Sequence, residues 1–352
     1  MRLLVTEHQA EMTRCACGHL NKAAFPEGVT ASVPYGPGVK AAAVYLKPYQ
    51  FLPYARTCER LGDFFGCPMS EGTLANLLDD CQARLEQPVQ QITARIAHAP
   101  VAPFAESGAR VEQNLWWRHT ASTAHATYDG IHPKRGLEAP EAIGILPDFR
   151  GRAIHDFWRP SFTYGCAHGL CHAHHLRERI FVHEQHHQAW ADAMIDCLLD
   201  IKQAVALAKP TTDHVTNARL RTFEARSQRI LDDGSAANPV SASPAPAGTT
   251  RGRHNKTTPR NLLERLDAHR QEALAFMYDF RVPFDNNLAE RDLRMMKVQQ
   301  KISGLFRRAD EAHAFCRIRS DLSTARKNAL GALEAIARVF TGNPFVPIAN
   351  TT

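Results

Sequence analysis

A change in the hydrophobic pattern at Val101 limits the folds open to this chain of 352 residues. The residues before it follow helical spacing, whereas the runs after it are rich in aromatic and β-branched residues separated by turn residues. The elements predicted from there, in chain order, are strands at 103–111, 115–121 and 123–129, a helix near 138–147, a strand at 151–157, and then further helices. This order indicates an α/β fold.

A helix-turn-helix pattern precedes these strands. YARTCERLGDFFG, at Tyr54–Gly66, predicts one helix, and a Gly-Cys-Pro turn follows it. Ser70 is suited to cap a second helix, EGTLANLLDDCQARL, which we expect to continue toward Ile96. Such a pair would place Thr73 and Asn76 at a DNA groove, although two short helices joined by a turn are also a common packing unit.

The long stretch after the fourth predicted strand is largely helical by pattern. Within it, residues 232–261 are rich in Pro, Ser, Ala and Gly without any periodicity, which predicts a disordered loop. The RGRHNK piece of this loop, at 251–256, is either a phosphate contact or an ordinary solvated basic segment.

The composition is compatible with a polyanionic partner. The net charge is +6, and the Lys and Arg residues are concentrated in particular stretches. No apolar run approaches the ~20 residues needed to span a bilayer, and the first residues are too short and too acidic for a signal peptide. We therefore expect a cytoplasmic protein without a membrane partner, whose nine cysteines are reduced thiols or metal ligands.

Two groups of cysteine and histidine residues are candidate metal sites. Cys15 and Cys17 form a C-x-C pair near His8 and His19, but a structural zinc commonly needs two such pairs, so a degenerate remnant is the alternative. The second group lies before a predicted helix and would either bind a metal, pack as apolar residues or contact DNA phosphates. Its members are Cys166, His168, Cys171, His172, His174 and His175.

The segment Phe284–Arg307 carries the strongest chemical signal. At 3.6 residues per turn, Glu290, Arg294, Lys297 and Lys301 share roughly one helical face, and Asp285 is placed to cap this helix. A carboxylate that holds a cation beside side chains that hold phosphates indicates metal-assisted phosphodiester chemistry. The alternative is an ordinary surface ion pair between Glu290 and Arg294.

DNNLAERDLR and KVQQKISGLF, within this segment, resemble the last catalytic segment of the insertion sequence 66 family of bacterial DDE transposases. Other blocks resemble that family in the same order. They are SVPYGPGVKAAAVYL (32–46), WRHTASTAHATYDGIHPKRG (117–136), IGILPDFRGRAIHDFW (143–158), GCAHGLCHAHHLRE (165–178) and FCRIRSDLSTARKNALGALEAI (315–336). Together they cover most of residues 10–340.

The resemblance implies a ribonuclease-H-like mixed-sheet catalytic core with an inserted helical domain. A helical region and a zinc-binding-like N-terminal remnant would precede this core. The family's full-length members have a further N-terminal region, so we expect either a truncated gene or a start placed late. The expected domains are residues 1–30 (remnant), 31–100 (helical, helix-turn-helix-like), 101–180 (first part of the core), 181–280 (helical insertion) and 281–340 (end of the core and C-terminal helices).

The resemblance also implies three carboxylates that hold two divalent cations, Mg²⁺ or Mn²⁺, ~4 Å apart. Asp156 would be the second acid and Glu290 the third, while the first should open the motif Asp-Glu-Thr-Gly. This chain has Ala105 at that position. Glu106 follows it, but neighbouring strand residues point to opposite faces, so Glu106 would reach the same site only after a one-residue slip. Asp129 is expected at the far end of the third strand.

Three functions follow from these residues. The first is a transposase that binds element-end DNA but is impaired in strand transfer, because removing one member of a catalytic unit costs roughly 4 kcal/mol or more. The second is a DNA-binding relative without catalysis, and the third is a metal-dependent nuclease that uses Glu106. The residues expected to contact DNA are Arg291, Arg294, Lys297, Lys301, Arg307, Arg308, Lys134 and Arg135.

The resemblance implies partners as well. They are the terminal repeats of the element, target DNA, further copies of the chain and accessory transposition proteins. The expected place of action is the bacterial nucleoid. The expected cofactors are Mg²⁺ or Mn²⁺ at the acids, with Zn²⁺ as a candidate at Cys15 and Cys17.

Overall fold

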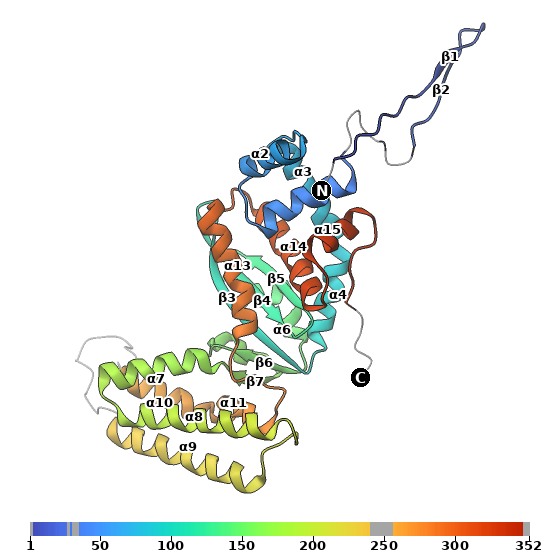
Figure 1. Ribbon diagram of the computed structural model, residues 1–352. Helices are drawn as coiled ribbons and strands as arrows, with labels where there is room; N and C mark the ends of the chain where they lie inside the picture. Colours follow the sequence, from blue (N-terminus) through green and yellow to red (C-terminus); the bar gives the residue numbers. More distant parts are fainter. Residues whose placement is uncertain (1–2, 27–28, 30–34, 240–255, 348–352) are drawn as a thin grey trace. The chain divides into compact units, whose positions relative to one another are not determined.

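The computed structural model describes residues 3–26, 29, 35–239 and 256–347 (Figure 1). The chain divides into two compact units, and each is described by itself. One unit comprises the residues up to Ile92, the short segment Arg110–Asn114 and the residues from Met296 onward. The other, which carries the predicted acids, comprises Thr93–Ala109 and Leu115–Met295. We call these the terminal unit and the central unit.

A five-stranded mixed sheet forms the middle of the central unit, and its order is β5-β4-β3-β6-β7. β6 lies parallel to β3 on one side and to β7 on the other, while β4 and β5 are antiparallel. The bounds are β3 Val101–Val111, β4 Asn114–Ser122, β5 Thr127–His132, β6 Arg152–His155 and β7 Ala167–Leu170. The sheet confirms the α/β class.

Sequence patterns predicted four of these strands and missed β7. This strand is only four residues long, and it lies inside the group of cysteine and histidine residues that we expected to lie between a strand and a helix. Its pairing with β6 is a contact across the sheet, which the local spacing of apolar residues does not encode. The third predicted strand also starts later than expected, at Thr127.

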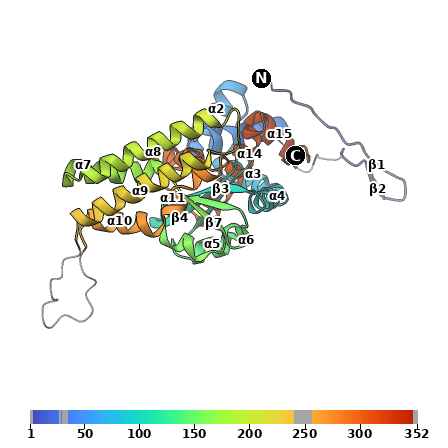
Figure 2. The ribbon, with the colours of Figure 1, turned by 90° about the horizontal axis from the view of Figure 1, so that it is seen from below.

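Helices form the rest of the central unit, and the long helices α7, α8, α9 and α10 pack together as a bundle (Figure 2). Its apolar core includes Trp190, Leu198, Leu263 and Phe276. The helices are α5 Glu138–Ile143, α6 Ile145–Asp148, α7 His172–His186, α8 Ala189–Ala208, α9 Asn217–Ala237, α10 Thr258–Ala268, α11 Arg270–Ala273 and α12 Ala275–Tyr278, with a 3-10 turn at Arg159–Thr163.

Both ends of the predicted disordered loop at 232–261 are helical. α9 continues to Ala237, and α10 begins at Thr258, where the hydroxyl of Thr257 accepts a hydrogen bond from the backbone N–H of Arg260 at 3.3 Å. This N-cap stabilises the start of α10, which lies within a range whose composition predicts a disordered loop. Residues 240–255, which include most of the RGRHNK piece, lie outside the described residues.

The terminal unit is mainly helical, and it confirms the two predicted helices joined by a turn. α2 ends at Gly66, whose φ of 60° favours glycine, and the hydroxyl of Ser70 accepts a hydrogen bond from the backbone N–H of Thr73 at 3.1 Å to begin α3. The helices are α1 Pro37–Val44, α2 Tyr54–Phe65, α3 Glu71–Arg84, α4 Glu86–Ala97, α14 Ala309–Lys327 and α15 Ala332–Phe340, with a π-helical turn at Tyr45–Tyr49. α4 extends past Ile92 into the central unit.

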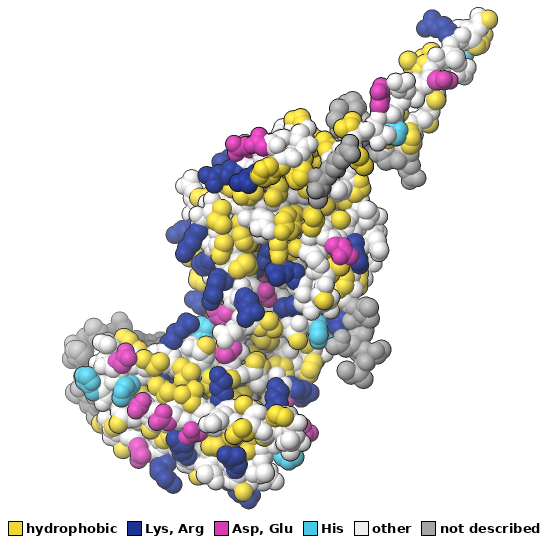
Figure 3. All heavy atoms as spheres, in the orientation of Figure 1, with side chains coloured by type: hydrophobic (Ala, Val, Ile, Leu, Met, Phe, Trp, Pro, Cys, Tyr) yellow, Lys and Arg dark blue, Asp and Glu magenta, His cyan; other side chains and the backbone are white. Residues whose placement is uncertain are grey.

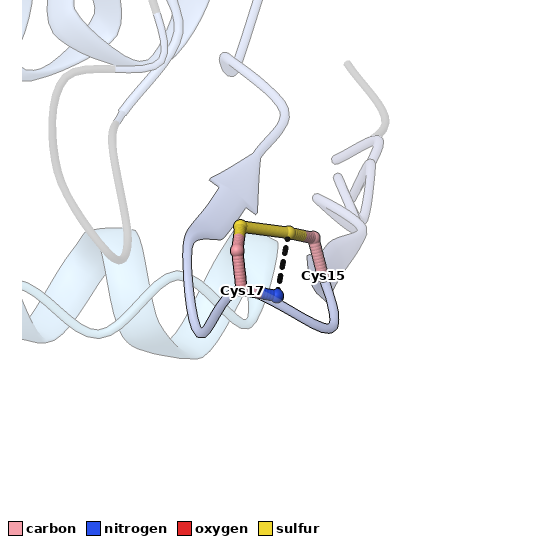
Figure 4. The surroundings of a disulfide bond; sticks show 2 residues. All are labelled: Cys15 and Cys17. Atoms are coloured by element: carbon pink, nitrogen blue, oxygen red, sulfur yellow. Dashed lines mark hydrogen bonds between the residues drawn. A yellow bond between two sulfur atoms is a disulfide. The ribbon is translucent and has the colours of Figure 1, made fainter.

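The N-terminal residues form a small exposed hairpin of β1 (Met12–Arg14) and β2 (Leu20–Lys22). At its turn, Cys15 and Cys17 are joined by a disulfide, and the Cys17 N–H donates a hydrogen bond to Cys15 Sγ at 3.2 Å (Figure 4). The expectation that all nine cysteines are reduced is therefore wrong for this pair, while the other seven are free thiols. Sulfurs bonded to each other are not the thiolates that a zinc ion requires.

Candidate active site

Asp156 stands directly after the carboxyl end of β6, the middle strand of the parallel part of the sheet. Its side chain is exposed, and its Oδ1 accepts a hydrogen bond from the backbone N–H of Trp158 at 3.1 Å. The next residue, Phe157, has a φ of 77°. A bulky residue rarely adopts this conformation, and such strain is found most often at functional sites.

Glu290 lies in the first turn of α13 (Asn287–Ser303), and two contacts fix the start of this helix. Asn286 donates hydrogen bonds from its side-chain amide to the carbonyl of Phe104 at 2.9 Å and from its backbone N–H to Cys171 Sγ at 3.1 Å. The Asp285 carboxylate accepts a hydrogen bond from the N–H of Asn287 at 3.1 Å, as expected of a capping side chain.

His174, on α7, lies beside one of the two predicted acids. Its Nε2 lies 3.4 Å from Glu290 Oε1. A hydrogen bond with Cys171 raises the pKa of this imidazole, and the negative charges of Glu290 and Asp156 raise it further, against the opposing effect of burial. The fold therefore brings Glu290 to an imidazole that is far from it in sequence.

A small cavity of about 50 Å³ adjoins Asp156. Ala105 and Asp156 both line this cavity, so the residue that stands in place of the expected first acid lies near the second acid. Most of the other lining side chains are apolar or aromatic, including Phe104, Tyr128, Ile145, Leu146 and Trp158. The volume is large enough for a few water molecules.

Glu106 lies nearer to Asp156 than strand alternation predicts. It lines the same cavity, and the charge of Asp156 contributes to raising the pKa of its carboxyl group. Burial is the largest cause of that increase, and Arg135 opposes it. The Nε and Nη2 atoms of Arg135 both lie 2.6 Å from Glu106 Oε1, so this carboxylate is held by a guanidinium group.

Arg135 is therefore engaged within the protein. Its guanidinium carbon lies 4.5 Å from the ring centroid of Trp117 and 5.9 Å from that of Trp158. These cation–π contacts and the ion pair to Glu106 hold Arg135 beside the cavity. Lys134, the other basic residue predicted in this loop, is exposed, and its backbone N–H donates to His132 Nδ1 at 3.1 Å.

The basic residues of α13 occupy one exposed side of the helix, opposite a buried side formed by Ala289, Leu293 and Met296. Lys and Arg side chains gather over α13 in the space-filling view (Figure 3). The exposed cations of this helix are Arg291, Arg294, Lys297 and Lys301, and Arg307 and Arg308 beyond its end are also exposed. Glu290 is half-buried, next to this exposed side.

The second cysteine and histidine group is divided among several environments. The side chains of His155 and His168 lie 3.2 Å apart, His172 contacts the carbonyl of Ala273 at 2.6 Å, and the thiol of Cys171 contacts Asn286. Within the part of the chain that the structure describes, no three Cys, His, Asp or Glu residues are arranged to hold a metal ion. Carboxylate oxygens such as those of Asp156 and Glu290 are the hard ligands that suit Mg²⁺ or Mn²⁺.

Two carboxylates beside a helix with a basic face are the arrangement expected of a protein that acts on a polyanion. The model of the Transposase IS66 family matches residues 32–314, which is most of the chain. The chain therefore belongs to the IS66 family of transposases. A search of curated proteins found no match. None of the helices in the described residues is long and apolar enough to cross a membrane.

Proposed function

We propose that this chain is a DNA transposase with a ribonuclease-H-like core that is weakened by the alanine at position 105. It would bind the ends of its own insertion sequence and use Asp156 and Glu290 in strand cleavage and transfer. The observation that carries this proposal is that Glu290 lies beside His174 on a helix whose exposed side is basic, while Asp156 directly follows the middle strand of the parallel part of the sheet.

Asp156 and Glu290 would hold a divalent cation, Mg²⁺ or Mn²⁺. When bound, such an ion stabilises negative charge on phosphate oxygens and lowers the pKa of a bound water molecule. His174 would keep the Glu290 carboxylate directed toward Asp156. Ala105 supplies no oxygen to this set, which is why we expect weak metal binding and slow chemistry.

The exposed basic side of α13 would bind the phosphate backbone of the element ends. Each phosphate that a Lys or Arg residue neutralises releases counterions, so the affinity should fall as the salt concentration rises. Exposed Lys134 would add a contact, whereas Arg135 would contribute less because Glu106 holds it. Target DNA, further copies of the chain and accessory proteins of the nucleoid are the other partners proposed.

The decisive experiment compares the natural chain with an Ala105→Asp variant. Both would be given Mn²⁺ and a duplex that carries the element's end, at protein concentrations that give equal DNA binding. Cleavage by the variant alone would support the proposal, whereas equal cleavage by both would show that Ala105 does not occupy the place of the missing acid. A Ser107→Asp variant is the matched control, because it adds an acid at another partly buried position of the same strand that does not line the cavity.

A nuclease that uses Glu106 is the second candidate, favoured by the electrostatic effect of Asp156 on Glu106. The ion pair with Arg135 opposes it, because a carboxylate held by a guanidinium group is less available to a metal ion. Under this alternative, Glu106→Gln should abolish any cleavage by the natural chain. Under the transposase proposal, the same substitution should leave residual cleavage unchanged.

A further inference from the structure

One face of the β4–β5 hairpin is polar although it is buried. Arg118, Thr120 and Ser122 alternate along β4, and the register of the hairpin places Asp129 opposite Thr120 and Thr127 opposite Ser122. All five side chains are at most 2% exposed. A buried strand face is normally apolar, so five polar side chains on one face indicate a specific task.

These side chains contact one another and the first half of α13. Arg118 forms an ion pair with Asp129, which also accepts a hydrogen bond from the Thr120 hydroxyl at 2.6 Å. Nη1 of Arg118 donates to the backbone carbonyls of Asp292 and Leu293, each at 3.1 Å. The hydroxyls of Ser122 and Thr127 donate to Asp292 Oδ2 at 3.0 and 2.9 Å.

We propose that this polar face is a register lock, in which Arg118, Ser122 and Thr127 hold α13 at the one rotation and height that place Glu290 beside His174. The proposal rests on the assignment of Glu290 and Asp156 to the active site. In this role the five side chains are positioning residues, since none of them reaches the acids themselves in the contacts described above.

Apolar contacts are non-directional, whereas hydrogen bonds are directional. The apolar side of α13, with Ala289, Leu293 and Met296, favours burial of this side of the helix but tolerates small shifts along the axis and small turns about it. Hydrogen bonds from Arg118 to two particular carbonyls tolerate no such movement, because buried donors without acceptors cost about 1–3 kcal/mol each.

The lock also acts at the right place on the helix. Asp292 and Glu290 are two residues apart, so their side chains are separated by about 200° around the helix axis. A rotation of α13 that breaks the contacts of Asp292 with the sheet therefore also turns Glu290, on the opposite side of the helix, by the same angle. His174 Nε2, at 3.4 Å from Glu290, would lose its partner in the same movement.

The variants that test the lock change only β4 and β5, and Glu290→Gln serves as a reference for the loss of the acid itself. A Ser122→Ala/Thr127→Val variant removes both donors to Asp292, while a Ser122→Thr/Thr127→Ser variant exchanges the residues and keeps both hydroxyls. A matched control, Thr222→Val/Ser227→Ala, removes two hydroxyls from α9 that donate only to carbonyls of their own helix. Mn²⁺ affinity of the full chain would be measured by electron paramagnetic resonance, with and without Glu290→Gln.

We expect the donor-free variant to bind Mn²⁺ about 10-fold more weakly, as is typical when the groups that orient a metal ligand are lost. The exchanged variant and the α9 control should bind like the natural chain. When Glu290→Gln is added to the donor-free variant, the affinity should be that of Glu290→Gln alone, because residues that act through one group are not additive.

The register lock is contradicted if the donor-free variant binds Mn²⁺ as the natural chain does, or if the exchanged variant loses as much affinity as the donor-free variant. It is also contradicted if the loss from the donor-free substitutions and the loss from Glu290→Gln multiply when the two are combined. A different result separates this failure from that of the proposed function. If Glu290→Gln alone leaves Mn²⁺ binding unchanged, Glu290 is not a metal ligand, and both the proposed site and the lock are overturned.

Discussion

The two units each bury one aspartate almost completely, but in opposite ways. Asp129, in the central unit, is 2% exposed and forms an ion pair with Arg118. Asp321, in the terminal unit, is 1% exposed, and its two carboxylate oxygens have no hydrogen-bond partner among the residues that the structure describes. Burial raises the pKa of Asp321 to about 7. A buried acid with a counter-ion can fix geometry, whereas one without it favours the neutral form.

The largest effect is expected when Asp129 loses its counter-ion and becomes, like Asp321, a buried acid without one. Arg118→Met removes the counter-ion and leaves a buried carboxylate unpaired, which typically costs about 3–5 kcal/mol. The loss should be seen as faster hydrogen exchange at the amides of β4 and β5. Because the central unit would then contain an unpaired acid, its stability should also begin to fall with rising pH. Unchanged exchange in Arg118→Met would contradict the importance of this ion pair.

The next effect is the pH dependence of the terminal unit. The pKa of Asp321 is raised in the folded protein from its ordinary value near 4 to about 7, so the folded state binds more protons between these values. The contribution of Asp321 to stability should therefore be complete below about pH 4 and fall by up to about 1.4 kcal/mol per pH unit until about pH 7.

Asp321→Asn tests this origin of the pH dependence. The amide keeps the shape of the side chain but does not ionise, so hydrogen exchange in α14 should depend less on pH than in the natural chain. Asp310→Asn, which changes a carboxylate in the exposed first turn of the same helix, is the control and should retain the pH dependence. Equal pH profiles for the natural chain and Asp321→Asn would assign the effect to another group.

A smaller effect is expected from the loss of another side-chain contact of Asp129, the hydrogen bond from Thr120. Thr120→Val removes the hydroxyl that donates to Asp129 at 2.6 Å, while it keeps the β-branched shape that suits a strand. The cost should be about 1–3 kcal/mol, because the ion pair with Arg118 remains. Chemical denaturation followed by exchange at β5 would measure it. A cost as large as that of Arg118→Met would mean that the hydroxyl, rather than the guanidinium, satisfies Asp129.

The smallest effect should come from an exposed pair. Glu334 and Arg338 on α15 lie 2.6 Å apart at i,i+4 spacing, and both side chains are exposed. Glu334→Gln should change the free energy of unfolding by at most about 0.5 kcal/mol, since solvent screens such pairs. Thermal unfolding would measure this value. A larger loss would show that solvent exposure alone does not explain why this pair should stabilise the protein less than the buried pair of Arg118 and Asp129.

Local patterns were sufficient for most of the helices and for four of the five central strands. The pair α2 and α3 follows from helical spacing, a glycine at the end of one helix and a serine at the start of the next. β7 was missed because four residues carry little periodicity. The disulfide between Cys15 and Cys17 was not predicted, because nine cysteines and an expected cytoplasmic location favour reduced thiols or metal ligands.

The candidate site was predictable only in part. Asp156 and Glu290 could be identified from a family resemblance, and so could the alanine that stands at position 105. The contact of His174 with Glu290 was hidden, because His174 was one of six residues in a dense group. Its place three residues after Cys171 in the first turn of a helix predicts that these two side chains share one helical face, but it does not predict that Glu290 lies beside them.

The sequence by itself determined several of the helices, the α/β class and the membership of a transposase family. Each of these depends on residue types at short spacing or on motifs in a fixed order. The tertiary structure decided which residues meet: Glu290 with His174, Glu106 with Arg135, and the polar face of β4 and β5 with α13. The physical reason is that burial and hydrogen bonding between distant segments depend on how strands and helices pack, and local spacing carries no record of that packing.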